Sequence, residues 1–428
     1  MKTVAIIGGK LQGVEAVYLA KKAGMKSLLI DKNPMAIASG FCDEMGVFDV
    51  LKKEPQLIEL LKKADFILPA LEVDEVHDAL LEISEQYGFK LAFDKDAYAI
   101  TSSKRRSDEL MRKHMIPAPK HFTSVRELQD ASEAQVVCDA YIIKPSEESG
   151  SVGVSRVETV EEVRAFLSKT DNHESWVVQE YLEGRSYSIE VLGTPGLYRT
   201  YEITEIHMDD EYDCKMVTAP CFISDSTNSA REELFDSAKA EFSKLAIRLA
   251  ELVKLHGIMD VEVIDHNGTL KVLEIDARIP SQTPMAVYHS SGVNLLSELA
   301  DITLNGKFTS EMAETNKDAS ERTETVEVTN VGLEISQTTS KKTTMRKYTA
   351  IEHYLIDETG VHHKGEGIMG ESNPLVYREN FFGADEALTD YDEKKSVWRA
   401  TFINSAESEE ELTQKRTLML QLLQTARQ

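Results

Sequence analysis

The sequence predicts a protein of mixed class, with an α/β domain at its N-terminus and α+β sections after it. Strands and helices alternate through the first hundred residues, whereas the middle of the chain carries runs typical of antiparallel strands. The length of 428 residues suggests two or three domains. Hydrophobic residues make up 42% and charged residues 28%, ordinary values that exclude a fibrous or wholly disordered chain.

The first hundred residues alternate short apolar runs with helical patterns. The strand-like runs are 3–7, 27–31 and 66–70, and the helical patterns are 12–23, 54–63 and 73–87. Such alternation predicts a parallel, doubly wound sheet. We therefore expect a first domain over residues 1–100.

The middle section, residues 101–305, mixes helices with antiparallel strands. Its strand-like runs are 141–145, 152–157, 176–181, 186–192 and 198–206, and its helical patterns are 104–115, 159–169 and 230–255. Two more strands, GIMDVEVID and TLKVLEIDAR, flank Asn267-Gly268, a strong signal for a hairpin. We expect one domain of two lobes, 101–182 and 183–305.

The remainder, residues 306–428, reads as a C-terminal α+β region. Its polar stretch 308–325 predicts a surface loop or a disordered insert. Strand-like runs with glycine turns occupy 326–403, and a helix is expected at 408–427.

Charge and cysteine content narrow the functional classes. The 48 basic and 73 acidic residues give a net charge of −25, which disfavours nucleic acid and anionic membranes as partners. The four cysteines form no CxxC pair, so we expect reduced thiols rather than disulfides or a zinc site. Without a signal-peptide pattern or an apolar stretch of 18 residues, the predicted location is cytoplasmic.

The two strands of the predicted hairpin carry the most informative charged residues. With a period of two, Asp260 and Glu262 share one face, and Glu274, Asp276 and Arg278 share one face. Aligning the strands brings Glu262, Glu274 and Asp276 together, where like charges repel unless a cation lies among them. Carboxylate oxygens shared with phosphates suit Mg²⁺. Arg278 can hold a phosphate or carboxylate with two hydrogen bonds.

Two lysines upstream indicate phosphate binding. Lys104 begins a basic helix, and Lys144 ends a strand that is followed by a loop of small residues, Ser146–Gly153. Such a loop can offer backbone N–H groups and hydroxyls, those of Ser149 and Ser151 included, to phosphates. The strand end Gln179–Leu182 offers backbone groups for an adenine edge.

The N-terminal glycine turn, Gly8–Gly13, leaves several interpretations open. It fits a dinucleotide fingerprint only partly, because Lys10 stands where the second glycine is expected. Asp31 stands where a ribose-binding acid would stand. The turn could bind a nucleotide through Lys10 and Asp31, bind a substrate, or only connect strand to helix.

Taken in order, these runs resemble the ATP-grasp superfamily of carboxylate–amine ligases over about residues 1–300. The matching runs are SSKRRSDELMRKHMIPAPK, IIKPSEESGSVGV, VVQEYLEGRSYSIEV, MDVEVI and LEIDARIPSQTP. Within it, GGKLQG, DKNP, DEYDCKMVT and VYHSSGVNL are most similar to the ligases of pyrrolysine biosynthesis, which join 3-methyl-D-ornithine to L-lysine. The region after 308 resembles them poorly.

The resemblance implies an ATP-grasp fold with a Rossmann-like N-terminal domain, and ATP and Mg²⁺ as cofactors. The implied ATP contacts are Lys104, Lys144, Gln179, Glu180, Tyr181 and Leu182. The implied magnesium ligands are Glu262, Glu274 and Asp276, the last replacing an asparagine of many relatives. The implied lysine contacts are Leu11, Gln12 and Glu72, and those of the ornithine are Arg185, Ser186, Tyr187 and Asp225.

The implied reaction forms an acyl phosphate on the ornithine carboxylate, which the ε-amine of lysine then attacks. Arg278 and Lys144 are its expected catalytic residues, and a homodimer is a possible assembly. Other ATP-grasp amino-acid ligases remain an alternative. A nicotinamide oxidoreductase that uses the glycine turn is another, although the shifted glycine and the carboxylate hairpin argue against it.

Overall fold

The computed structural model describes residues 1–122, 127–128, 138–147, 153–170, 175–220, 229–309, 324–329, 332–337 and 346–426. Ser149, Ser151, Asp225 and residues 310–323 of the polar stretch 308–325 lie outside these residues.

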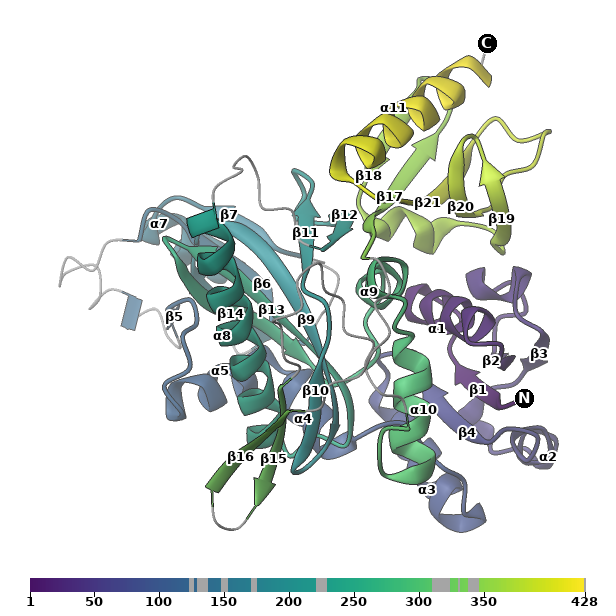
Figure 1. The fold of residues 1–428 in the computed structure, drawn as a ribbon, viewed down its shortest axis with the longest axis horizontal. Coiled ribbons are helices and arrows are strands. Elements are labelled where there is room, and N and C mark those ends of the chain that lie inside the picture. Colours follow the sequence, from purple (N-terminus) through teal and green to yellow (C-terminus); the bar gives the residue numbers. More distant parts are fainter. Residues whose placement is uncertain are drawn as a thin grey trace.

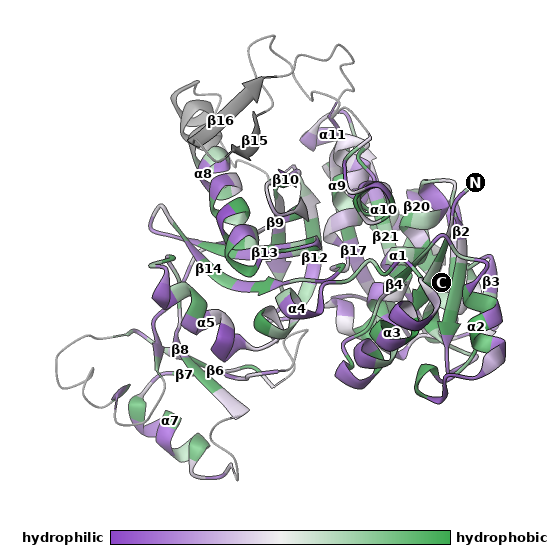
Figure 2. Ribbon diagram, turned by 90° about the horizontal axis from the view of Figure 1, so that it is seen from below, coloured by the Kyte–Doolittle hydropathy of each residue, from purple (hydrophilic) through white to green (hydrophobic). Residues whose placement is uncertain are grey.

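The N-terminal domain contains the predicted parallel sheet, with strand order β3-β2-β1-β4. Its strands are β1 (Thr3–Ile7), β2 (Lys26–Asp31), β3 (Glu44–Val47) and β4 (Phe66–Pro69), and its helices are α1 (Leu11–Lys22), α2 (Pro55–Leu61) and α3 (Asp74–Tyr87). Val4 and Ile6 point toward α1, whereas Ala5 and Ile7 point toward α2 and α3. Because successive strand residues face opposite sides, both faces are buried and the sheet is doubly wound. Its strands are mainly hydrophobic (Figure 2).

A small antiparallel sheet follows in the order β5-β8-β6-β7. Its strands are β5 (His121–Phe122), β6 (Tyr141–Pro145), β7 (Ser155–Val157) and β8 (Trp176–Glu180), and its neighbouring helices are α5 (Lys104–Lys113) and α7 (Val160–Leu167). Helix α7 begins at a capping box, in which the Thr159 hydroxyl and the Glu162 carboxylate accept each other's backbone N–H. Val163 and Leu167 of this helix pack on Ile143 of the sheet.

The largest sheet of the described chain has thirteen strands and runs through both remaining regions. Its strands are β9 (Arg185–Thr194), β10 (Leu197–Thr200), β11 (Thr204–Met208), β12 (Cys214–Ala219), β13 (Gly257–His266), β14 (Thr269–Asp276), β15 (Glu324–Thr329), β16 (Gly332–Gln337), β17 (Tyr348–Ile356), β18 (Val361–Lys364), β19 (Val376–Phe381), β20 (Ala384–Thr389) and β21 (Trp398–Ala406). Pairing of β12 with β17 makes the C-terminal strands continuous with the middle section.

The run 198–206, expected as one strand, forms two strands that both lie antiparallel to β9. Thr200 is opposite Val191 and Thr204 is opposite Ser188, so four steps on one strand face three on the other. This extra residue is a β-bulge, which bends the strand and separates β10 from β11.

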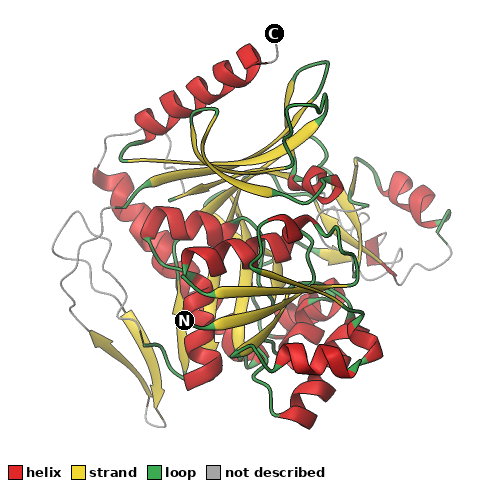
Figure 3. Cartoon of the chain, turned by 90° about the vertical axis from the view of Figure 1, so that its right-hand side faces the viewer, coloured by secondary structure: helices red, strands yellow, loops and turns green. Residues whose placement is uncertain are grey.

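Five further helices of the described chain cover the sheets. They are α4 (Lys95–Thr101), α8 (Ser229–Val253), α9 (Thr283–Ser291), α10 (Leu295–Asn305) and α11 (Glu409–Ala426). Helix α11 lies over the C-terminal strands, where Met419 and Leu423 are buried against Phe402 (Figure 3). None of the helices in the described ranges is both long enough and apolar enough to span a membrane.

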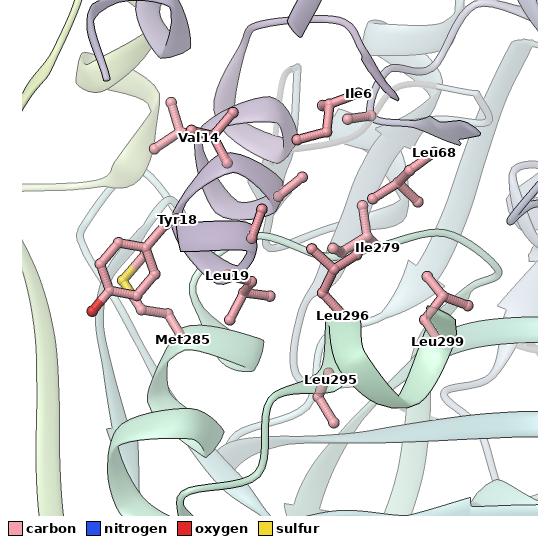
Figure 4. Close-up of a cluster of buried hydrophobic side chains, with 14 of the residues drawn as sticks. Ile6, Val14, Tyr18, Leu19, Leu68, Ile279, Met285, Leu295, Leu296 and Leu299 are labelled. Carbon is pink, nitrogen blue, oxygen red and sulfur yellow. The ribbon is translucent and has the colours of Figure 1, made fainter. Parts of the chain in front are cut away.

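Helix α1 connects the three regions (Figure 1). Its apolar side packs against α9 and α10, where Leu19 lies near Leu295 and Leu296 (Figure 4). The Tyr18 hydroxyl donates a 2.6 Å hydrogen bond to Glu386 Oε2 on β20. The N-terminal domain is therefore packed against both the middle section and the C-terminal region.

Candidate active site

One face of the β9–β13–β14 sheet carries five acidic side chains, which we call the carboxylate face: Glu190, Asp260, Glu262, Glu274 and Asp276. The predicted hairpin is confirmed, and a bulge between Glu262 and Val263 sets its register so that Glu262 is opposite Glu274 and Asp260 is opposite Asp276. On the other side of β13, Glu190 of β9 is opposite Asp260. Three neighbouring strands therefore present acids to the same surface.

Glu190 is the member that the sequence analysis missed. It is a single acid in the apolar strand RSYSIEVLGT, and it is completely buried. Only the pairing of β9 with β13, about 70 residues later in the chain, brings it to the site. The signal in the sequence was one charged residue where a hydrophobic one is expected in a buried strand.

Burial and mutual repulsion raise the pKa of most of these acids. Burial, followed by the Asp260 and Glu274 charges, raises the pKa of Glu262 well above its ordinary value. Burial likewise raises the pKa of Asp276 to about 7. Although burial also acts on Glu274, the charges of Lys104 and Lys144 leave its pKa below the ordinary value. A cation at this face would favour the ionised forms.

The donor chemistry of the carboxylate face suits a hard divalent cation, although its side chains do not form a closed coordination site. Among the described residues, no three His, Cys, Asp or Glu side chains converge as metal ligands. Both carboxylate oxygens of Glu190 and Oδ1 of Asp276 are nevertheless buried without a hydrogen-bond partner in the part of the chain that the structure describes. Unpartnered carboxylate oxygens are the ligand type that Mg²⁺ prefers.

The two predicted lysines converge on Glu274. Lys104 is the first residue of α5, and its Nζ lies 3.2 Å from Glu274 Oε1. The backbone N–H of Lys104 donates to Ser146 O, which joins α5 to the end of β6. Lys144 on β6 is 9% exposed, and burial lowers its pKa while the charge of Glu274 opposes that shift. The lysines thus come from the small sheet's lobe and face the acids of the large sheet.

A cavity between α5 and β14 contains three of the predicted residues. Lys104, Gln179 and Glu274 line it together with apolar groups that include Met111 and Val272. About half of the lining is polar or charged, since Thr101, Ser107 and Asp108 also contribute to it. The nucleotide contacts predicted at Lys104 and Gln179 therefore lie at one cavity.

The segment Gln179–Leu182 is only partly available for an adenine edge in this conformation. The N–H groups of Glu180 and Tyr181 donate to Lys120 O and Ala140 O. The Glu180 carboxylate lies 2.9 Å from Lys271 Nζ. These contacts hold the strand end between the lobes, and the remaining polar groups of the segment would have to meet the adenine.

Arg278 links the carboxylate face to the N-terminal domain. Its Nη2 lies 2.9 Å from Asp276 Oδ2, and its Nε lies 2.9 Å from Glu72 Oε1. The same Glu72 oxygen accepts a 2.5 Å hydrogen bond from Gln12 Nε2. One chain of contacts therefore joins residues predicted for three roles: lysine binding (Gln12 and Glu72), catalysis (Arg278) and magnesium binding (Asp276). Leu11 directly precedes Gln12 at the start of α1.

The glycine turn has a clear structural role. Gly8 has φ +101°, and a Cβ on Gly13 would lie 2.2 Å from Gly8 O, so both positions need glycine. Asp31 accepts hydrogen bonds of 2.8 Å from the N–H groups of Gly9 and Asn33. Lys10 is exposed, and in the described part of the chain no hydrogen bond or ion pair joins it to the carboxylate face. Nucleotide binding by Lys10 and Asp31 stays a prediction.

The predicted ornithine contacts on β9 lie on two faces. Ser186 has the same parity as Ser188 and so shares the side of the carboxylate face. Tyr187 points the other way and packs on the core that α8 covers. Arg185 lies 3.6 Å from Glu205 Oε1 at the start of the strand. Of these three side chains, that of Ser186 is therefore on the site's side of the sheet.

Comparison with known proteins adds a family to this geometry. The family model of the ATP-grasp domain matches residues 101–282. The 3-methyl-D-ornithine–L-lysine ligase of Methanosarcina acetivorans is 40% identical over 300 residues, which cover 70% of this chain and 73% of that protein. The ligase of the same name from Methanosarcina mazei is 39% identical over 299 residues, covering 70% and 71%.

Solved structures show the same fold at low identity. An ADP complex of N5-carboxyaminoimidazole ribonucleotide synthetase has a TM-score of 0.63 and 15% identity, covering 99% of this chain and 98% of that one. Biotin carboxylase from Campylobacter jejuni has a TM-score of 0.66 and 12% identity, covering 98% and 90%. The chain therefore has the ATP-grasp fold and belongs to the family of the 3-methyl-D-ornithine–L-lysine ligases.

Proposed function

We propose that this protein is an ATP-dependent ligase that joins the carboxylate of 3-methyl-D-ornithine to the ε-amine of L-lysine. The observation that carries the proposal is identity of 37–40% over 70% of the chain to three ligases of that name. The carboxylate face, with two lysines and Arg278 beside it, supports the ATP chemistry independently. Membership of the family leaves the oxidoreductase alternative without support.

In the proposed reaction, the ornithine carboxylate attacks the γ-phosphorus of ATP, giving ADP and an acyl phosphate. Lys104 and Lys144 neutralise charge on the transferred phosphoryl group. Arg278 holds the acyl phosphate with its planar fork of N–H donors. Glu262, Glu274 and Asp276 would hold Mg²⁺, which supplies positive charge to the phosphates.

The neutral ε-amine of lysine then attacks the acyl carbon, and phosphate leaves as the amide forms. Free lysine is mostly protonated near pH 7, so a group at the site must accept the proton of the ε-ammonium or lower its pKa. We assign Glu72 to orient the lysine amine, since it lies between Gln12 and Arg278. Leu11 and Gln12 complete the lysine contacts, while Ser186 and Asp225 serve the ornithine.

The test measures phosphate release from ATP with Mg²⁺, L-lysine and 3-methyl-D-ornithine, together with mass spectrometry of the product. The proposal predicts an amide-linked product and phosphate release that requires both amino acids. Phosphate release with other amino acids only would move this chain to another substrate pair within the ATP-grasp ligases. Absence of any ATP turnover would refute the proposal.

A variant tests the assignment of Glu72. Glu72→Gln should raise the KM for lysine at least tenfold more than the KM for ATP, because a charged hydrogen bond to the amine is lost. Equal effects on both constants would contradict the assignment.

A further inference from the structure

A second cavity, lined by apolar side chains and a few polar ones, lies where helix α1, the start of α9 and the C-terminal strands meet. Leu11, Val14 and Glu15 line it from α1, and Gln282 and Met285 line it from α9. Figure 4 shows Val14 and Met285 on the facing helices. The C-terminal region adds Glu366, at the start of a short 3-10 helix (Glu366–Glu371), and His353 of β17. The cavity accommodates a water-sized group.

Glu15 is the unsatisfied group of this cavity. Its side chain is 2% exposed, and Oε2 accepts a 3.0 Å hydrogen bond from the N–H of Gln282. Its other oxygen, Oε1, is buried without any hydrogen-bond partner in the described residues. An unpaired buried carboxylate oxygen is costly, so a missing donor is expected beside it.

A second carboxyl group, that of Glu366, lines the same cavity. Its Oε2 accepts a 2.8 Å hydrogen bond from the Ser281 hydroxyl, three residues after Arg278. Burial raises its pKa to about 7, and its charge in turn raises the pKa of Glu15 beyond the effect of burial. In the described part of the chain, neither carboxylate has an ion pair with a lysine, arginine or histidine within 4 Å.

The remaining polar groups of the cavity are fixed by the fold. Gln282 has φ +68°, a left-handed conformation that non-glycine residues adopt rarely. Its side-chain oxygen lies 2.8 Å from His353 Nε2, and Cys214 Sγ donates to it at 3.5 Å. The strained backbone directs the Gln282 N–H to Glu15, so the acid is held with Oε1 unpaired.

These features match a primary ammonium group. Two buried carboxyl groups disfavour an anion, and an ammonium carries three donors that can meet Glu15 Oε1 and Glu366. A divalent cation of the calcium or magnesium type needs six or more oxygens, more than this cavity offers. The cavity takes a group of water size, which fits the ammonium itself, and the apolar side chains of Leu11, Val14 and Met285 suit the carbon that bears it.

We propose that this cavity binds a non-reacting ammonium group of one of the two diamino acid substrates, with Glu15 and Glu366 as its acceptors. The proposal rests on the proposed function and names a binding determinant for it. Lysine has one such group, its α-ammonium, and 3-methyl-D-ornithine has two. Leu11 lines the cavity and directly precedes Gln12, and Ser281, which donates to Glu366, lies three residues after Arg278, so the cavity adjoins the Gln12–Glu72–Arg278 contacts in the chain.

Calorimetry on the wild type, Glu15→Gln and Glu366→Gln tests the proposal. The probes are L-lysine, 6-aminohexanoate, which lacks the α-ammonium, and D-ornithine with its two deamino analogues, D-2-aminopentanoate and 5-aminopentanoate. For one parent amino acid, both variants should raise the Kd roughly 10- to 100-fold, the usual effect of losing a charged hydrogen bond. The analogue that lacks the bound ammonium group should bind the wild type with a Kd roughly 10- to 100-fold above that of the parent amino acid. Its Kd should be the same for the wild type, Glu15→Gln and Glu366→Gln.

The matched control is Glu386→Gln, because Glu386 lies at the same interface but pairs with Lys22 and Tyr18 outside the cavity. An effect on lysine alone assigns the cavity to lysine, and an effect on ornithine alone assigns it to the ornithine. The proposal would be overturned if Glu15→Gln and Glu366→Gln bound both amino acids with the same Kd as the control. It would also be overturned if, in these two variants, the analogue without the ammonium group still bound more weakly than its parent amino acid. Binding is measured without turnover, so failure to form the amide product refutes the proposed function separately.

Discussion

Glu190 gives a direct test of the carboxylate face, through the dependence of stability on pH. The side chain is completely buried, and neither carboxylate oxygen has a hydrogen-bond partner in the described residues. Burial, followed by repulsion from Asp260, raises the pKa of Glu190 from 4.5 to about 8. Between these values the folded state holds one proton more than the unfolded state. Stability from this group is therefore complete below pH 4.5 and is lost as the pH rises toward 8.

The loss has a calculable slope. One proton corresponds to about 1.4 kcal/mol per pH unit. The shift spans 8 − 4.5 = 3.5 units, which is about 5 kcal/mol in full. Glu190→Gln keeps the shape and removes the titration, so its stability relative to the wild type should increase by about 3 kcal/mol between pH 5.5 and 8.

Urea unfolding at half-unit pH steps, without ATP or Mg²⁺, measures this difference. Glu386→Gln is the matched control, since hydrogen bonds from Lys22 and Tyr18 outweigh burial and keep the pKa of Glu386 below its ordinary value. Glu386 is then ionised in both the folded and the unfolded state above pH 5.5, so the effect of this variant on the unfolding free energy should be nearly constant from pH 5.5 to 8. Parallel pH curves for the wild type and Glu190→Gln would refute a buried, protonated Glu190.

Three further substitutions test the site and its supports. Arg278→Lys should lower kcat roughly 100-fold with a smaller change in the KM for ATP, because a lysine cannot bridge the two carboxylates that flank Arg278. Steady-state kinetics measures both constants, and a change in the KM for ATP with an unchanged kcat would contradict this role. Gly13→Ala should lower the unfolding free energy by more than about 2 kcal/mol, since its Cβ would collide with Gly8 O, and an unchanged Tm would contradict the turn geometry. Tyr18→Phe should cost about 1–3 kcal/mol because Glu386 loses its hydroxyl donor, and calorimetric melting would detect it.

Local patterns predicted the parts of the site that lie close in sequence. The Asn267-Gly268 turn predicted the hairpin, as the structure confirms, but it could not set the register at the acids. Counted from the turn, Glu262 would lie opposite Leu273, and a bulge between Glu262 and Val263 brings it opposite Glu274 instead. Helix α9 was missed because TPMAVYHSS is buried over most of its surface and so lacks the polar face that marks a helix in a sequence. The bulge after Thr200 was missed for a similar reason, since one extra residue leaves the apolar pattern of the run nearly intact.

Contacts between distant segments could not be read from such patterns. Nothing local to Glu72 indicates that it meets Arg278, about 200 residues later, because that contact depends on how the N-terminal domain packs on α9 and α10. The resemblance supplied both residues, but with separate roles. The structure shows instead that one carboxylate is shared by Gln12 and Arg278.

The same division between local and distant contacts separates the groups proposed to bind ATP and Mg²⁺ from most of those proposed to bind the amino acids. The groups proposed for phosphates and Mg²⁺ lie on α5, β6 and the β13–β14 hairpin, all within residues 101–282, where the ATP-grasp family model matches. The groups proposed for the amino acids, Ser186 and Asp225 excepted, come from α1, the loop after β4 and the C-terminal region, which meet only in the folded chain. Relatives that share the first set can therefore use ATP in the same way on different substrates. For this chain, substitutions at Glu15 or Glu366 should alter amino acid binding while leaving the KM for ATP nearly unchanged.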